Sequence, residues 1–243
     1  MRLLTFTNRT AKEILRDPLT VIFGLGFPLV LILLLSAIQA NVPVSLFEIS
    51  NLTPGITVFG LSFMTLFSAT LIAKDRETAL MQRLYTTPLK ATDFILGYTL
   101  PIIPIAVLQC VVCYVVAVIL GMEVKLEMLF AILMIIPIAV FFIALGLLFG
   151  SIFNVKQVGG ICGALLTNLT AWLSGVWFDL KLVGGVFEKI AGLLPFVHAV
   201  ELERAVLAGN YSGMFPHLWW VLGYAVGAMV LAIIYFLHQM KKQ

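Results

Sequence analysis

Charged residues are scarce in this sequence: Asp, Glu, Lys and Arg make up 11% of its 243 residues, whereas soluble domains have about 25%. Hydrophobic residues make up 61%, and the mean hydropathy is +1.09. A soluble domain of this size still exposes roughly a third of the surface of its unfolded chain, so it could not hide this much apolar sequence from water. The composition therefore excludes a soluble globular protein and predicts a protein embedded in the lipid bilayer.

Cysteine is also rare, which excludes several functions. Cys110, Cys113 and Cys162 all lie in apolar runs, so they form neither a secreted disulfide framework nor a closed metal site. We interpret the C-x-x-C at 110–113 as small residues for helix packing rather than as a redox motif. The net charge of +3 is too small to indicate a nucleic-acid partner.

Long apolar runs are the dominant feature that is present. A helix needs about 20 mostly apolar residues to cross a bilayer. Six stretches meet this requirement, so the sequence predicts an all-α integral membrane protein in one transmembrane domain, residues 1–243. The third stretch is long and carries Pro101 and Pro104, which predict a kink. The predicted spans are 20–40, 53–73, 94–120, 128–150, 158–178 and 217–238.

Ionisable groups are missing from these six stretches. They contain no Asp, Glu, Lys or Arg, and their only histidines, His217 and His238, lie at the ends of the last one. Intramembrane ionisable residues mark proton relays, ion sites and catalysis, so their absence weighs against an ion-coupled carrier and an intramembrane enzyme. We predict no catalytic residue, metal site or cofactor in this chain. The chain also lacks the G-x-x-x-x-G-K-[ST] phosphate loop, so energy for uphill transport must come from another protein.

The distribution of Lys and Arg predicts the orientation. Segments expected to face the cytoplasm hold eleven of the fifteen basic residues, which places both termini in the cytoplasm. Residues 1–19 do not resemble a cleaved signal peptide, because the apolar run after them is long enough to span the membrane. The segments expected outside hold only Lys125, Lys181, Lys189 and Arg204.

An interfacial amphipathic helix is predicted within residues 1–19, ending at Asp17-Pro18. Phe6 interrupts its polar face, and the helix is either a general basic anchor or a dedicated docking element. Its apolar side would hold Leu3, Leu4, Thr7, Ala11, Ile14 and Leu15, and its basic side Arg2, Arg9, Lys12 and Arg16.

Residues 179–215 stay apolar but contain no run long enough to span, so we predict two short helices broken around Leu194-Pro195, lying on or dipping into the outer leaflet. Leu194, Pro195 and Phe196 are candidate residues of an extracellular gate, the alternative being a cap on the bundle. His198 and Glu201 share a helix face, but two ligands fall short of a catalytic zinc site. A salt-bridged surface helix is the favoured interpretation of this cluster.

Two groups of residues are candidates for lining a transport path. Phe59, Phe63 and Phe67 form one stripe on the second span, and Asn168 and Thr170 are polar residues of the fifth. Packing between helices is the alternative interpretation of both groups, since hydroxyls and amides commonly join helices by hydrogen bonds.

The first cytoplasmic loop, residues 74–93, is the most charged stretch of the chain. We predict that the second span continues as a helix through Leu84 and that Thr87-Pro88 begins a new helix. This stretch resembles the membrane subunits of ABC-2 type ATP-binding-cassette exporters, on DRETALMQRLYTTPL at 75–89 and DFILG at 93–97. The segment LPFVHA at 194–199 is similar to the Pro-centred segment of that family. In the loop, the family usually has a Gly before the Thr-Leu, whereas Glu77-Thr78-Ala79 stands here.

The resemblance implies an interfacial helix, six spans and a helical re-entrant segment between spans five and six. It also implies that two permease chains pair with two ATPase subunits, which bind ATP and Mg²⁺, and that spans one, two and five surround the path. The docking residues that we would assign by this resemblance are Arg76, Glu77, Met81, Arg83, Thr87 and Pro88.

The sequence therefore predicts a plasma-membrane permease that exports a hydrophobic or amphiphilic compound such as a drug, antibiotic or lipid. The second permease is either an identical chain or a paralogue. Export of polysaccharide, glycolipid or sodium by the same family remains an alternative. A membrane-surface enzyme using His198 and Glu201, or a scaffold that binds an ATPase without transport, are alternatives from other classes.

Overall fold

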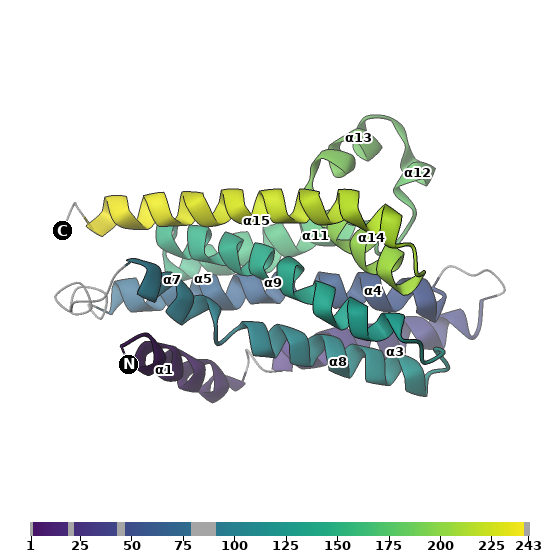
Figure 1. The fold of residues 1–243 in the computed structure, drawn as a ribbon, viewed down its shortest axis with the longest axis horizontal. Coiled ribbons are helices and arrows are strands. Elements are labelled where there is room, and N and C mark those ends of the chain that lie inside the picture. Colours follow the sequence, from purple (N-terminus) through teal and green to yellow (C-terminus); the bar gives the residue numbers. More distant parts are fainter. Residues whose placement is uncertain (1, 19–21, 43–46, 79–90, 241–243) are drawn as a thin grey trace.

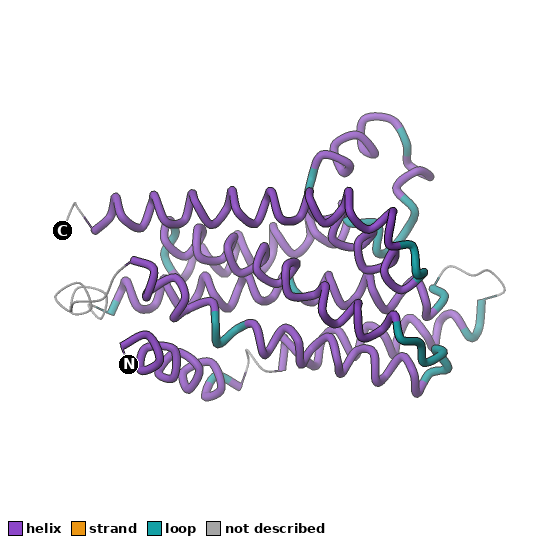
Figure 2. The backbone as a smooth tube through the Cα atoms, viewed as in Figure 1, coloured by secondary structure: helices purple, strands orange, loops and turns teal. Residues whose placement is uncertain are grey.

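The computed structural model describes residues 2–18, 22–42, 47–78 and 91–240. Every regular element in these ranges is a helix, and most helices run along one common direction (Figure 2). The helix α1 (Arg2–Arg16) lies at the same end of the bundle as the C-terminal end of α15 (Tyr211–Met240) (Figure 1). Both ends of the described chain therefore lie on one side, as the predicted topology requires.

Within the described residues, five helical stretches are long and apolar enough to cross a membrane, and each coincides with a predicted span. Their ends extend beyond the predicted bounds in the second and last spans, where the helices reach Glu77 and begin at Tyr211. The elements that form the five stretches are η1 (Ile22–Gly26) with α3 (Phe27–Gln39), α4 (Ile49–Gly60) with α5 (Ser62–Glu77), α7 (Ala91–Thr99) with α8 (Ile103–Ile119), α9 (Glu127–Ile152) and α15.

The predicted fifth span, 158–178, falls on three consecutive short elements. These are α10 (Val155–Val158), η2 (Gly159–Leu166) and α11 (Thr167–Leu173). Their combined stretch is not among the five that qualify as spans, because it contains polar residues and glycines, and because the helix ends at Leu173, before a turn in which Gly175 has φ +72°. The six-span layout and the interfacial place of α1 therefore stay predictions.

Two predicted features of the helix ends can be compared directly with the structure. The kink near Pro101 and Pro104 is confirmed: α7 ends at Thr99 and α8 begins at Ile103. The helix of the second span, α5, ends at Glu77, where the N–H of Thr78 closes its last turn on the Lys74 carbonyl, at 3.0 Å. The rest of its predicted continuation, through Leu84, lies outside the described residues.

The centre of the bundle is α9, which packs against α5, α8, α14 and α15. It approaches α5 closely, where Gly146 and Gly150 bring the two backbones together: a Cβ on Gly150 would lie 2.6 Å from the Ala69 carbonyl oxygen. The Thr65 hydroxyl donates to the Phe142 carbonyl across this contact, at 2.7 Å. Small residues allow helices to approach closely where lipid removes the usual hydrophobic drive for association.

The outer segment contains α12 (Leu180–Val183), α13 (Gly185–Leu193) and α14 (Pro195–Leu207). The predicted break falls at Leu194, which is extended at ψ 151° and precedes Pro195 in the first turn of α14. Whereas α12 and α13 project from the bundle (Figure 1), α14 is packed against α4, α9 and α15. This segment therefore returns the chain into the bundle before the last span.

Candidate functional site

A buried carboxylate joins three helices at the end of the bundle where α5 leads into the charged loop, which we call the inner end after the predicted orientation. Asp75 is 2% exposed and accepts two hydrogen bonds from the Arg9 guanidinium, at 2.6 and 2.7 Å. It also accepts one from the Tyr98 hydroxyl, at 2.7 Å. A bidentate Arg–carboxylate pair is the strongest geometry available to these groups. Asp75 therefore fixes α1 and α7 to the end of α5, and we call these three residues the inner junction.

Aromatic packing supports the inner junction. Phe6 packs edge-on against Phe94 and Tyr98, with ring centroids 5.6 and 5.0 Å apart. Gly97 leaves the room for this, since a Cβ there would overlap the Phe6 ring. Phe6, which interrupts the predicted polar face, is thus the residue that seats α1 on α7.

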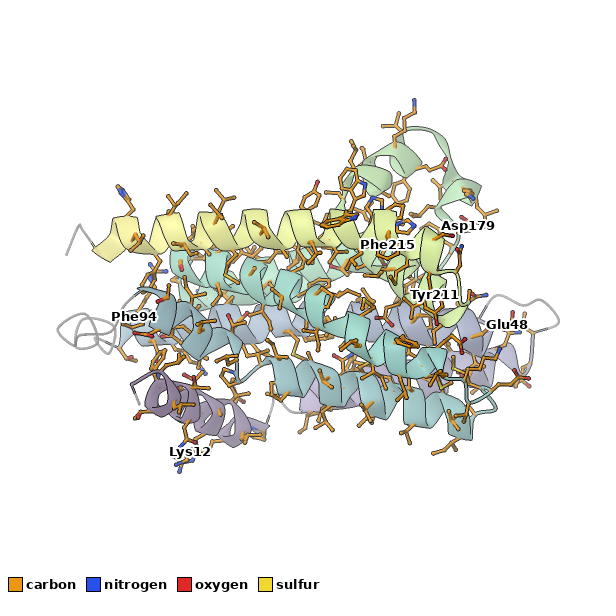
Figure 3. The ribbon with its side chains drawn as sticks, viewed as in Figure 1. Lys12, Glu48, Phe94, Asp179, Tyr211 and Phe215 are labelled. Carbon is orange, nitrogen blue, oxygen red and sulfur yellow. The ribbon has the colours of Figure 1, made fainter. Side chains whose placement is uncertain are left out.

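The helix α1 presents a different buried face from the one the sequence predicts. Phe6, Thr10 and Ile14 are buried, whereas Leu4 and Leu15 are exposed. Leu4 and Leu15 stay available to lipid, and Lys12 points away from the bundle (Figure 3). The predicted placement of Arg9 on the solvated basic side is wrong, because the buried Asp75 recruits it.

The contacts of Arg9 with Asp75 and Glu13 shift pKa values at the inner junction. The hydrogen bonds that Arg9 donates to Asp75, opposed by burial, raise the pKa of Arg9 above its already high value. Burial also raises the pKa of Glu13, although its ion pair with Arg9, at 2.6 Å, opposes that shift. Arg9 is therefore charged at every physiological pH, and its position is coupled to two carboxyl groups.

Two of the predicted docking residues have partners within the chain. Arg76 donates to the Gly150 carbonyl at 2.7 Å and to the Phe153 carbonyl at 3.3 Å, which caps the C-terminal end of α9. Glu77 accepts from the backbone N–H of Val155, at 3.0 Å, where α10 begins. The end of α5 is thus tied to α1, α7, α9 and α10. The remaining predicted docking residues, Met81, Arg83, Thr87 and Pro88, lie outside the described residues.

The aromatic stripe on the second span is buried within this chain. Phe59, Phe63 and Phe67 are each less than 10% exposed, and Phe63 packs edge-on against Phe27 of α3, with ring centroids 5.4 Å apart. Phe59 also packs on Trp177, at 5.8 Å. The stripe therefore fills the contact between the first two spans, and its role in a path stays a prediction.

The polar candidates of the fifth predicted span bond to their own helix. Asn168 is exposed and donates to the Ala164 carbonyl, at 2.8 Å. Thr170 is buried and donates to the Leu166 carbonyl, at 2.9 Å. Of these two, only Asn168 presents a surface that a second chain or a substrate could reach.

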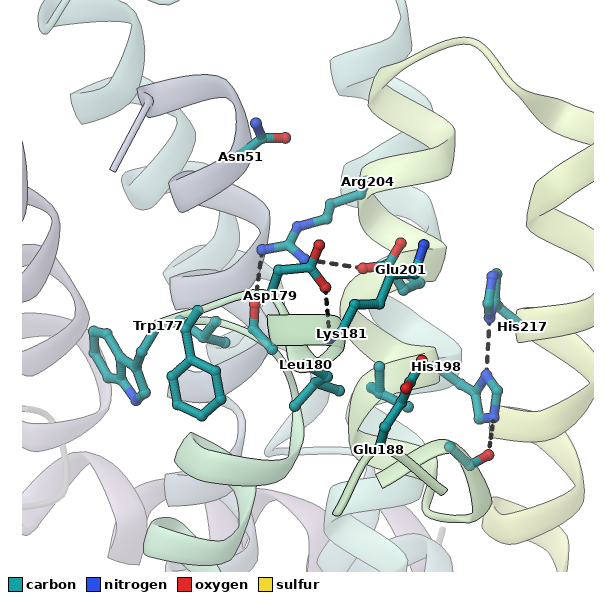
Figure 4. A pocket seen from close by; sticks show the side chains of 15 residues that line it. Asn51, Trp177, Asp179, Leu180, Lys181, Glu188, His198, Glu201, Arg204 and His217 are labelled. Carbon is teal, nitrogen blue, oxygen red and sulfur yellow. Dashed lines mark hydrogen bonds and ion pairs between the residues drawn. The ribbon is translucent and has the colours of Figure 1, made fainter. Parts of the chain in front are cut away.

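A cavity of about 590 Å³ opens at the outer end, between α12, α13, α14 and the start of α15 (Figure 4). Arg204 pairs with Glu201 at 2.9 Å and donates to the Gly175 carbonyl at 3.0 Å. This ion pair confirms the predicted salt bridge within α14. Trp177, Phe178 and Leu180 supply an apolar wall, while Asp179, Lys181 and Glu188 supply charge. The cavity thus combines apolar and charged surfaces, which suits an amphiphile.

His198, the candidate residue of the enzyme alternative, is held by structural partners. Its Nε2 lies 2.9 Å from the Gly192 carbonyl oxygen and its Nδ1 lies 2.8 Å from Nδ1 of His217. Because a carbonyl only accepts, Nε2 carries the hydrogen and Nδ1 accepts from His217. Burial lowers the pKa of His198, which agrees with a neutral ring. Within the described residues no cluster of three His, Cys, Asp or Glu could hold a metal ion.

The candidate gate residues lie at the root of the outer segment. Leu194 is partly exposed, and Pro195 is buried. Phe196 is also buried and packs on Phe141 and Phe142 of α9, with both centroid distances 6.2 Å. They hold α14 on the bundle, and a gating role for them stays a prediction.

The buried acid Glu203 in α14 was not predicted from the sequence. Glu203 is fully buried and accepts a hydrogen bond from the Tyr114 hydroxyl of α8, at 3.0 Å. A signal was present: Glu203 continues the buried face of α14 defined by Phe196, Ala199, Val200 and Val206.

The fold and these sites define a polytopic helical membrane protein whose charged groups are concentrated at the two ends of the bundle. The family model described as ABC-2 type transporter matches residues 1–208. The chain therefore belongs to the ABC-2 type transporter family, and it is a membrane permease of an ABC transporter rather than a catalytic domain. No curated protein matches the sequence in a similarity search.

Proposed function

We propose that this chain is the permease subunit of an exporter driven by a separate ATPase, and that residues 74–93 are its coupling loop. The observation that carries the proposal is the inner junction together with the Arg76 and Glu77 contacts. These bonds anchor the start of that loop to α1, α7, α9 and α10. A force applied to the loop by an ATPase would thereby reach these four helices.

The chemistry of the chain supports a hydrophobic or amphiphilic cargo. The five spanning stretches are strongly apolar, and the outer cavity places an aromatic wall beside charged groups. The apolar tail of an amphiphile would contact the apolar spans and the aromatic wall, and its headgroup would contact the charged groups of the cavity. We assign export from the cytoplasmic side across the plasma membrane on this basis and on the predicted orientation.

The proposed assembly contains two permease chains and two ATPase subunits. ATP and Mg²⁺ would bind the ATPase, because this chain has no phosphate-binding loop. The exposed side of η2 and α11, which includes Leu165, Asn168 and Trp172, is the surface that we assign to the second permease.

Substitutions in the loop test the docking proposal. We expect Arg83→Ala and Glu77→Gln to leave the permease inserted in the membrane but to reduce recovery of the ATPase at least about tenfold, the effect of losing roughly 1.4 kcal/mol of binding. The measurement is affinity purification in mild detergent, followed by quantification of the ATPase that co-purifies.

Glu77→Gln is the informative variant because its amide oxygen still accepts from Val155 while its charge is gone. Lys181→Ala, at the outer end of the bundle, is the matched control and should recover the ATPase normally. Normal recovery of the ATPase with both loop variants would show that residues 74–93 are not the docking element.

A further inference from the structure

The protein around Glu203 favours the neutral, protonated form of its carboxyl group. Its Oε2 accepts from the Tyr114 hydroxyl, at 3.0 Å, and its Oε1 has no hydrogen-bond partner among the described residues. No part of the side chain reaches solvent. Burying an ionised carboxylate without full compensation is costly, and such a group takes up a proton instead.

The other charged and titratable groups around Glu203 do not provide that compensation. Tyr114 and Cys110, both on α8, are the titratable neighbours that interact with it. The buried faces of α4, α9, α11, α13 and α15, which pack against α14, carry no titratable residue. On α14 itself, Arg204 is occupied by Glu201 and His198 by His217. Among the described residues, no cation therefore balances a charge on Glu203.

Protonation of Glu203 is linked to the position of α14, because the Glu203 carboxyl group contacts a side chain of α8. Its helix is bounded by the extended Leu194 and by Gly209 at φ +69°, so α14 is a short helix with a break in the chain at each end. Tyr114 lies on α8, five residues before that helix ends at Ile119, which is about 7.5 Å along the axis. The contact between the two side chains thus joins α14 to the outer part of the bundle.

We propose that Glu203 is a proton-binding site that holds α14 against α8 when protonated and releases it when deprotonated. In the described state Oε1 carries the proton while the Tyr114 hydroxyl donates to Oε2. When α14 moves away from α8 and water enters, the O–H bond of the acid breaks and the proton passes to water. The inference concerns regulation of the permease and uses the proposed function only in its transport readout.

The direction of the pH effect follows from linkage. Burial raises the pKa of Glu203 to about 8, although the Tyr114 hydrogen bond lowers it, whereas a hydrated glutamate has a pKa of about 4.3. Between these two values the packed state binds one more proton than the separated state. Raising the pH through this range therefore shifts the equilibrium toward separation, by up to about tenfold per pH unit, and the shift ends above about pH 8.

Infrared spectroscopy of the purified permease in lipid nanodiscs tests proton binding directly. We expect a protonated-carboxyl band that titrates with a midpoint of about 8, is absent in Glu203→Gln, and is present in Glu201→Gln, which changes the partly exposed acid two residues away. Tyr114→Phe should move the midpoint to higher pH, because it removes the bond that favours the carboxylate. A midpoint of about 4.3, or a band that survives in Glu203→Gln, would overturn the proposal.

The ATPase activity of the complete complex tests the linkage to conformation. The ratio of wild-type to Glu203→Gln activity should change several-fold from acidic pH to above pH 8, because the variant stays in the neutral, low-pH form. A ratio that is independent of pH would overturn the role of the proton in holding α14. The infrared result does not depend on an ATPase, so a permease without such a partner would refute the proposed function while leaving the proton site testable.

Discussion

Replacing Arg9 with alanine is expected to lower the free energy of unfolding by about 3 kcal/mol. The substitution leaves the buried Asp75 carboxylate with the Tyr98 hydroxyl but without its cation. We place the loss at the lower end of the range for broken buried ion pairs because the Arg9 side chain is 35% exposed, so water can replace part of its interaction. The midpoint of thermal unfolding in detergent should fall by roughly 6–12 °C, at about 2–4 °C per kcal/mol.

Two variants separate the ion pair from a general effect of charge on α1. Lys12→Ala removes an exposed cation three residues away and should leave the midpoint unchanged. Arg9→Lys keeps the charge but loses the second hydrogen bond, so it should lie between wild type and Arg9→Ala. An Arg9→Ala protein as stable as Lys12→Ala would mean that α1 is not held by Asp75.

Alanine at Gly150 is expected to destabilise the protein by about 2–3 kcal/mol. The new Cβ would lie 2.6 Å from the Ala69 carbonyl oxygen and 2.8 Å from its Cα. Both are backbone atoms, so a rotamer change cannot relieve the overlap and α5 must move away from α9. The move would also strain the bonds by which Arg76 caps α9. Thermal unfolding in detergent measures the loss.

Gly227→Ala is the matched control for Gly150→Ala. It places the same methyl group on α15, where no atom lies within 4 Å of the new Cβ. Alanine favours a helix over glycine by up to about 1 kcal/mol, so this variant should be slightly stabilised. Equal effects of the two substitutions would show that the change in helix propensity, rather than the α5–α9 contact, governs stability.

The sequence predicted the elements that depend on long apolar runs and on proline. Five spans, the kink between Thr99 and Ile103 and the break at Leu194 are local properties of the chain, so they could be predicted without knowing which helices touch. The docking residues were assigned by family resemblance and the path residues by their pattern within the spans together with that resemblance, and both remain predictions.

Features that depend on tertiary contacts were not predicted. Arg9 has the periodicity of a solvated basic face, and only the position of Asp75 on another helix shows that it is recruited inward. Glu203 lies outside every predicted span, so counting charges within the spans could not reveal that α14 carries an acid into the bundle. The short contact at Gly150 likewise needs knowledge that α5 and α9 are neighbours.

The burial of all three cysteines makes the native chain a suitable background for mapping membrane topology by thiol labelling. Cys110, Cys113 and Cys162 are fully inaccessible in the folded protein, so a maleimide that does not cross the bilayer should not label them. Single cysteines introduced at exposed positions, such as Lys12 near the N-terminus or Lys181 in α12, would then be the reactive thiols. Labelling them from each side of intact vesicles would assign every connection to a compartment without first removing the native thiols.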